Sequence, residues 1–218
     1  MHTKRIAAGY PKGKKWATTP RGPHRRRESM PLVDLVKQLR LADKTEEAMR
    51  IITSGAIQVD GEPQRSHNYG LGLMDVVSIP ALGKHYRILP DKKWLACREI
   101  GEGEAKTKLC RVNGKRLVSK GKVQVNFHDG GSIITDRKVS VNDTVAVGLP
   151  ERKIKDVIPY DIGNQAIVVS GRHRGETGVV KEILKATASR KSLTTIGDYK
   201  TLTDYIFITG KDKPVISV

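Results

Sequence analysis

The sequence predicts an α+β chain that is mostly β and is divided among several small domains, and three observations lead to this prediction. Short runs of β-branched residues recur around glycine-bearing turns through most of the 218 residues. Helical periodicity is confined to a short region that follows residue 29. Aromatic residues make up only 5% of the chain, which fits small β modules better than one large hydrophobic core.

The charge of the chain indicates a polyanionic partner. Forty basic and 23 acidic residues give a formal net charge of +17. An excess of this size favours nucleic acid first and an anionic membrane second. No apolar run approaches the roughly 18 residues that a spanning helix needs, so no membrane partner is expected. Nearly half of the excess lies in residues 1–29, which carry nine Lys or Arg and one acidic residue.

Residues 1–29 have Pro or Gly every few positions and show neither a helical nor an alternating pattern. Alone, such a segment cannot bury enough surface to offset its ordering entropy, so we expect a basic extended arm that orders only on a polyanion. An organelle transit peptide is the alternative, but frequent Pro and Gly argue against its amphipathic helix. Trp16 could stack on bases or pack on the protein itself. The expected nucleic-acid contacts of the arm are Lys4, Arg5, Lys14, Lys15, Trp16, Arg21, Arg25, Arg26 and Arg27.

Two short helices are predicted next. Ser29 is a suitable N-cap with Pro31 in the first turn, and an apolar face then continues to a helix end near residue 41. Asp43 and Glu46 give a capping-box-like start to a second helix, which Gly55 ends. A strand at 57–59, a tight turn at 60–61 and a strand at 76–79 follow.

This order of two helices, a glycine stop, V-D-G and a later D-V-V-S-I strand resembles the alpha-L RNA-binding module of ribosomal proteins, pseudouridine synthases and some tRNA synthetases. By that resemblance, the RNA-facing cations of the module are Lys37, Arg40, Lys44 and Arg50. Many members carry arginines on these helices where this chain has Pro31, Thr45 and Met49, and residues 30–80 are net acidic. The module could therefore serve largely as a scaffold for the arm.

Residues 81–162 are predicted to form β structure with recurrent turns. An Asn113-Gly114 dipeptide predicts a hairpin over 109–118. A second hairpin is expected over 123–135, turning at 128–131, and a further strand over 144–149. The scattered Lys and Arg side chains of this region are expected to form a solvated or phosphate-facing surface.

Residues 165–183 predict a β-hairpin, with an apolar run at 166–169, a loop at 170–177 and an apolar pair at 179–180. Together with glycines at 171, 175 and 178, this pattern resembles a KOW motif, which opens small SH-three-like barrels. The tail offers strands at 192–196 and 205–209 to close the barrel. Candidate RNA contacts in the loop are Arg172, His173 and Arg174.

The order of basic arm, alpha-L module, β-rich central domain and KOW barrel resembles the ribosomal protein S4e family over essentially the whole chain, and the compact length resembles its archaeal members. The most specific stretches are PRGPHRRRESMPL at 20–32, GLMDVV at 72–77 and TLTDYIFITGKDKP at 201–214. The resemblance implies a cytoplasmic small-subunit protein that binds ribosomal RNA, contacts neighbouring ribosomal proteins, does not self-associate and supports translation. The predicted domains are 1–29, 30–92, 93–162 and 163–218.

No catalytic residue, cofactor or metal site is expected. The glycine loop at 171–178 lacks the Lys-Ser/Thr ending of a phosphate loop, and Gly70-Leu-Gly72 lacks a third spaced glycine. Cys97 and Cys110 are expected to be reduced thiols. Two alternatives to a ribosomal protein are an RNA-modifying enzyme with an appended alpha-L module and a KOW-containing transcription-elongation factor. The first lacks its catalytic Asp, because Val118 follows G-K-R-L at 114–117, and the second lacks a recognisable polymerase-binding domain.

Overall fold

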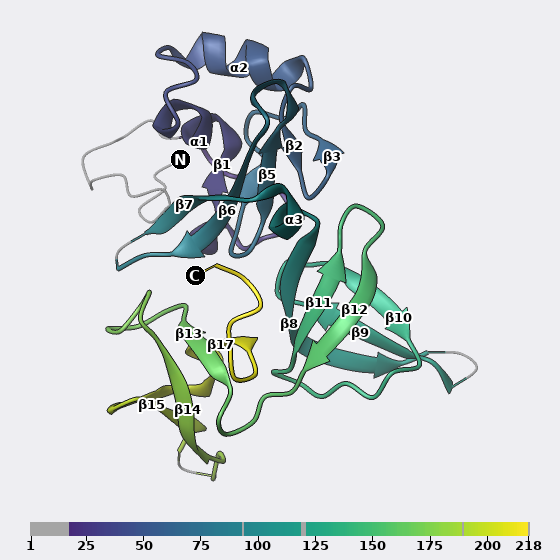
Figure 1. Cartoon of the computed structure of the whole chain (residues 1–218), viewed down its shortest axis with the longest axis vertical. Coiled ribbons are helices and arrows are strands. Elements are labelled where there is room, and N and C mark those ends of the chain that lie inside the picture. Colours follow the sequence, from purple (N-terminus) through teal and green to yellow (C-terminus); the bar gives the residue numbers. More distant parts are fainter. Residues whose placement is uncertain (1–17, 93, 119–120, 189, 218) are drawn as a thin grey trace. The chain divides into compact units, whose positions relative to one another are not determined.

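The structure is a computed structural model that describes residues 18–92, 94–118, 121–188 and 190–217. The described chain divides into two compact units (Figure 1). Unit 1 comprises the described residues up to 89, together with 94–108 and 149–151. Unit 2 comprises the described residues of 90–92, 109–148 and 152–218. The mostly β fold class predicted from the sequence is confirmed.

Unit 1 combines two short helices with a five-stranded sheet. The helices are α1 (Leu32–Gln38) and α2 (Thr45–Thr53). The sheet has the order β3-β2-β5-β6-β7, and a separate antiparallel pair joins β1 to β4. These strands are β1 (Met30–Pro31), β2 (Gln58–Val59), β3 (Glu62–Pro63), β4 (Gly70–Leu71), β5 (Val76–Ile79), β6 (Lys84–Pro90) and β7 (Leu95–Ile100). Three short helical turns, η1 (Arg26–Glu28), η2 (Pro80–Leu82) and α3 (Glu102–Ala105), complete the unit.

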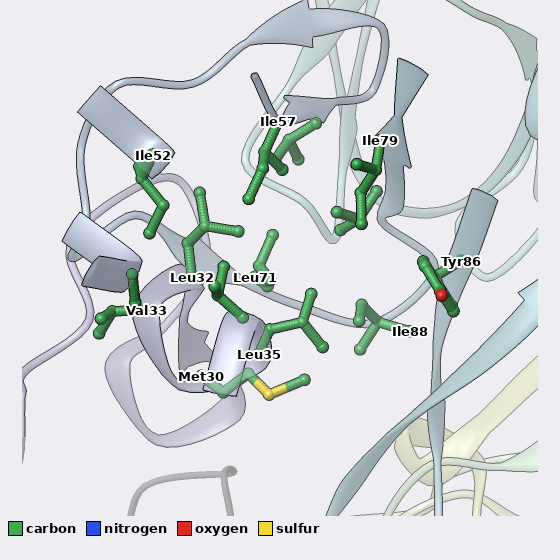
Figure 2. Packing of buried hydrophobic residues seen from close by; sticks show 14 of the residues in the cluster. Met30, Leu32, Val33, Leu35, Ile52, Ile57, Leu71, Ile79, Tyr86 and Ile88 are labelled. Atoms are coloured by element: carbon green, nitrogen blue, oxygen red, sulfur yellow. The ribbon is translucent and has the colours of Figure 1, made fainter. Parts of the chain in front are cut away.

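The core of unit 1 lies between the helices and the sheet. Figure 2 shows side chains of α1 and α2 converging on those of the strands, and the labelled residues are buried. The apolar face predicted for α1 supplies Leu32, Leu35 and Val36 to this core. Burying a side chain of this size stabilises the fold by about 1.5–3 kcal/mol, which is how such short helices are held in place.

Both helices begin later than the sequence predicts. Residue Pro31, not Ser29, is the N-cap of α1, because residues 30–31 pair with β4 before the helix begins. Ser29 is buried, and its hydroxyl donates to the carbonyl of Arg25 at 3.1 Å. In α2 the capping interaction is shifted by one residue, since the Lys44 amide donates to Glu47 at 3.2 Å. Gly55 follows the last turn with φ +81°, as expected of a glycine that ends a helix.

Unit 2 contains two five-stranded sheets. The first has the order β10-β9-β8-β11-β12 and the second the order β16-β15-β14-β13-β17. The first comprises β8 (Thr107–Leu117), whose first residues belong to unit 1, β9 (Val123–Phe127), β10 (Ser132–Thr135), β11 (Thr144–Gly148) and β12 (Lys153–Ile158). The second comprises β13 (Gln165–Val168), β14 (Thr177–Leu184), β15 (Leu193–Ile196), β16 (Tyr199–Leu202) and β17 (Ile206–Gly210), with the turn η4 (Thr203–Tyr205) before the last strand.

The hairpin predicted at Asn113-Gly114 is wrong. Strand β8 runs through both residues, and its register with β9 shifts between Val112 and Gly114. Neither residue has the positive φ that a type I′ turn requires. Val112 is held on its other side, donating to Asp143 at 2.9 Å and accepting from Asn142 at 2.9 Å. The dipeptide is therefore accommodated as a β-bulge within a long strand.

The other hairpins predicted for unit 2 are present. Strands β9 and β10 pair around the turn at 128–131, and β13 and β14 pair across the KOW loop. The strand register of the second sheet shifts at Gln165/Ala166 and at Val180/Glu182, as at β-bulges. Strand β16, which was not among the predicted strands, pairs with β15 across a turn at 197–198.

The two sheets of unit 2 are joined by specific side chains. The Arg111 guanidinium on β8 donates to the carbonyls of Asp204 and Ile206 at 2.7 and 3.0 Å. His128 accepts from the Arg111 amide at 3.1 Å, and its ring packs edge-on against Phe207 on β17, with centroids 5.3 Å apart. Residues on both sides of the predicted boundary at 162/163 thus belong to one compact unit. The predicted domain bounds remain a prediction.

Replacement of Gly178 by alanine should destabilise unit 2. An added Cβ would lie 2.7 Å from Cγ2 of the buried Ile196, so the β14–β15 pairing must shift. We expect a loss of about 1–3 kcal/mol in the free energy of unfolding, measured by urea denaturation followed by circular dichroism. Gly114→Ala is the control, because a Cβ there meets no atom within 4 Å. Equal losses for the two variants would contradict the argument.

Candidate nucleic-acid interface

Residues 21–28 form a basic surface in the described part of unit 1. The side chains of Arg21, Arg25, Arg26 and Arg27 are exposed, and Glu28 is the one acidic residue among them. Arg25 lies 3.8 Å from Glu28, but both side chains are largely exposed, so this pair leaves the guanidinium available to solvent. Four predicted contact residues therefore lie together on one short segment.

This segment is held against unit 1 by its own backbone and by one histidine. The Arg21 amide donates to Asn68 at 2.7 Å, and the Gly70 amide donates to Arg21 at 2.7 Å. His24 lies 3.0 Å from the Asp75 carboxylate, and its side chain is only 5% exposed. The expectation that all of residues 1–29 order only on a polyanion is thus wrong for residues 18–29, because these nonlocal contacts provide burial that the segment lacks alone.

The Asp75 carboxylate belongs to a buried ionic cluster. Lys108, 1% exposed, donates to Asp75 at 2.6 Å and to Asp60 at 2.5 Å. Asp75 also accepts from the Gly72 amide at 2.8 Å. Burial opposes ionisation of Asp75, but Lys108 and then His24 outweigh it and hold the pKa of Asp75 below its ordinary value. Burial and the neighbouring Asp75 raise the pKa of Asp60 despite Lys108.

A second buried cation extends this polar core. The Arg87 guanidinium, on β6, donates to the carbonyls of Glu104 and Thr107 at 2.9 and 2.7 Å. Its side chain is fully buried. The prediction that the cations of residues 81–162 lie on the surface is wrong for Arg87 and Lys108, which are buried. The adjacent apolar residues Ile88 and Leu109 were the one sign in the sequence that these cations could be buried. The acidic partners of Arg87 and Lys108 are not adjacent to them in the sequence, so the ion pairs could not be predicted.

The four cations predicted on the alpha-L helices differ in their surroundings. Arg40, Lys44 and Arg50 are exposed, at the end of α1, at the start of α2 and in the last turn of α2. Lys37 is half-buried and lies 3.6 Å from the buried carboxylate of Asp34. Three of the four are therefore free to face a polyanion, and the role of all four remains a prediction.

In the KOW loop, the three predicted contact residues are not equivalent. Arg172 is exposed. His173 stacks on Tyr199 with ring centroids 4.1 Å apart and lies 3.1 Å from Glu176. Arg174 is half-buried. Arg172 is thus the residue of this loop best placed to meet a phosphate, whereas His173 has a packing role within unit 2.

Five predicted contact residues lie outside the described part of the chain. These are Lys4, Arg5, Lys14, Lys15 and Trp16. Among the residues that the structure does describe, no group of three or more His, Cys, Asp or Glu side chains is arranged to hold a metal ion. In that same part of the chain, no helix combines the length and the hydropathy that crossing a bilayer requires.

Both cysteines are free thiols, Cys97 half-buried and Cys110 buried. Burial and then the nearby Glu99 raise the pKa of Cys97 to about 12. Since the thiolate is the reactive species, we expect negligible reaction of the folded protein with a disulfide reagent at neutral pH. Unfolding in guanidinium should release two thiols per chain. Fast reaction of a thiol in the folded protein would show this environment to be wrong.

Comparisons with known proteins match three successive parts of the chain. Residues 30–77 match the S4 domain, 82–154 the ribosomal family S4e, and 162–190 the KOW motif. A protein of Methanothermobacter thermautotrophicus, named small ribosomal subunit protein eS4, is 39% identical over 96% of this chain and 90% of its own length. The protein of that name from Archaeoglobus fulgidus is 37% identical over all of this chain and 98% of its own.

A solved structure agrees with these matches. The crystal structure of the 30S ribosomal protein S4e from Thermoplasma acidophilum is 31% identical, covers 84% of this chain and 96% of that chain, and gives a TM-score of 0.75. The fold, the S4 domain and the basic surfaces define an RNA-binding protein of the ribosomal class. The chain belongs to ribosomal family S4e. The relatives confirm the prediction of a structural ribosomal protein that is not an enzyme.

Proposed function

We propose that this chain is a structural constituent of the small ribosomal subunit, located on cytoplasmic ribosomes, where it binds ribosomal RNA and contacts neighbouring ribosomal proteins without self-association. The observation that carries the proposal is full-length similarity to proteins named small ribosomal subunit protein eS4. The net charge of +17 gives such a protein a favourable electrostatic approach to folded RNA.

The contact residues that we propose form three groups on the described chain. The first is the docked segment with Arg21, Arg25, Arg26 and Arg27. The second is the helix pair, where Arg40, Lys44 and Arg50 are exposed and Lys37 is half-buried. The third is the KOW loop with Arg172, beside His173 and Arg174. Lys4, Arg5, Lys14, Lys15 and Trp16 are proposed from the sequence alone. Such exposed cations would neutralise phosphates, and no enzymatic step is required of them.

Gradient sedimentation tests the proposal. The full-length tagged chain, expressed in an archaeal host, should sediment with small subunits and remain there after a wash at moderate salt. Recovery mainly with RNA polymerase would instead favour the transcription-elongation alternative. A uridine-modifying enzyme would release tritium from labelled RNA, and we expect no such release.

A further inference from the structure

Segment 20–29 packs against Gly70 and Gly72, where the absence of side chains leaves a slot for it. An added Cβ on Gly72 would collide with the imidazole ring of His24. An added Cβ on Gly70 would lie 3.1 Å from the Ser29 hydroxyl and 3.3 Å from Pro20. Gly70 and Gly72 flank Leu71, the G-L-G pattern that could not be assigned to a phosphate-binding loop. Their missing side chains admit this neighbouring segment of the same chain.

Buried charged side chains line the slot. Asp75 faces the His24 ring at 3.0 Å, and its carboxylate is fixed by Lys108 and by the Gly72 amide. Asp75 and Lys108 are 2% and 1% exposed, so neither side chain is placed to touch an RNA phosphate. Lys108 is shared between Asp60 and Asp75, and the His24 ring supplies Asp75 with a further polar partner from the docked segment.

We infer that His24 is a positioning residue for RNA binding, and that the slot formed by Gly70, Gly72 and Asp75 docks the basic segment so that its four arginines are ordered before RNA arrives. This inference rests on the proposed function, since it concerns how RNA is bound. Docking leaves Arg21, Arg25, Arg26 and Arg27 exposed while the backbone beneath them is fixed. Ordering a binding segment in advance lowers the conformational entropy that is lost on association.

The inference separates two quantities that loss of charge would change together. His24→Ala keeps every arginine, so the same phosphates can be neutralised and the salt dependence of binding should stay as it is. The dissociation constant should nevertheless rise about five- to twenty-fold, because the segment must now be ordered on the RNA. Gly72→Ala fills the slot from the opposite side and should give the same result with His24 intact.

The experiment uses the full-length chain and small-subunit ribosomal RNA in a filter-binding titration over a salt series. His85→Ala is the matched control, because it removes a different histidine of unit 1, which is half-buried and hydrogen-bonded to Ser78 at 2.8 Å. Hydrogen exchange of the RNA-free protein is measured in parallel. The amides of Arg21 and Gly70 should exchange at least about ten-fold faster in His24→Ala, while the amide of Ala48 in α2 stays protected.

Three results would overturn the inference. Unchanged exchange at Arg21 and Gly70 in both slot variants would show that His24 does not hold the segment. Faster exchange with an unchanged dissociation constant would show that docking does not assist binding. A salt dependence reduced as much as in a variant lacking the arginines would mean that the segment leaves the RNA altogether. If the wild-type chain binds no ribosomal RNA, the proposed function fails with it, and the exchange data still report separately on docking.

Discussion

Lys108→Met is expected to destabilise unit 1 by about 3–5 kcal/mol, because it removes the cation from a buried ionic cluster. In the wild-type chain, Lys108 Nζ lies 2.5 Å from the Asp60 carboxylate and 2.6 Å from the Asp75 carboxylate. The substitution leaves these two carboxylates without their shared cation. Leaving a buried charge unpaired costs more than the pair itself contributed. Unit 2 contains no tryptophan in its sequence, so urea denaturation followed by tryptophan fluorescence reports on unit 1. The midpoint should fall sharply.

Two comparisons distinguish an electrostatic loss from a packing defect. Lys106→Met removes a neighbouring lysine that is largely exposed and paired with Glu102, and it should leave the midpoint nearly unchanged. In wild type, the lowered pKa of Asp75 gives a contribution that is lost as pH falls below its ordinary range. Without Lys108 the pKa of each carboxyl in the folded state should rise. Lowering the pH should therefore increase the free energy of unfolding of the variant. The difference between Lys108→Met and wild type should therefore shrink between about pH 7 and pH 4.5, whereas a packing defect would keep it constant.

The predictable parts of the fold are those set by short-range patterns. The KOW hairpin followed from β-branched runs around a glycine-bearing loop, and β13 and β14 form it. The apolar face of α1 followed from its spacing, and its residues enter the core. In each case the residues that specify the element lie within it, so no knowledge of distant neighbours was needed.

The failures arose where distant residues decide the outcome. Asn113-Gly114 favours a tight turn locally, but bonds from Val112 to residues 142 and 143 keep the chain extended there. Segment 18–29 has no core of its own, and its order depends on Asn68, Gly72 and Asp75 some 50 residues away in sequence. From the sequence alone, Lys108 is expected at the surface. In the folded unit 1 it is buried, because it donates to Asp60 and Asp75, which are distant in the sequence.

Replacing Arg21, Arg25, Arg26 and Arg27 together by glutamine is expected to weaken binding to small-subunit ribosomal RNA on the order of 100-fold at physiological salt. If each guanidinium neutralises one phosphate, the slope of log affinity against log salt should become less steep by about 3. His24, Asp75 and the backbone bonds at Arg21 remain, so the segment should stay docked. Filter binding over a salt series measures both quantities, and hydrogen exchange at Gly70 verifies docking.

The matched control removes the same total charge from unit 2. The control replaces four exposed lysines that lie in different parts of unit 2, namely Lys122, Lys138, Lys185 and Lys211. Substituting glutamine for all four changes the net charge by the same amount, so a general electrostatic attraction would weaken equally in the two variants. We expect the loss of affinity to be at least about ten-fold smaller in the control. Equal losses would show that the docked arginines act only through net charge, because position on the fold would then contribute nothing.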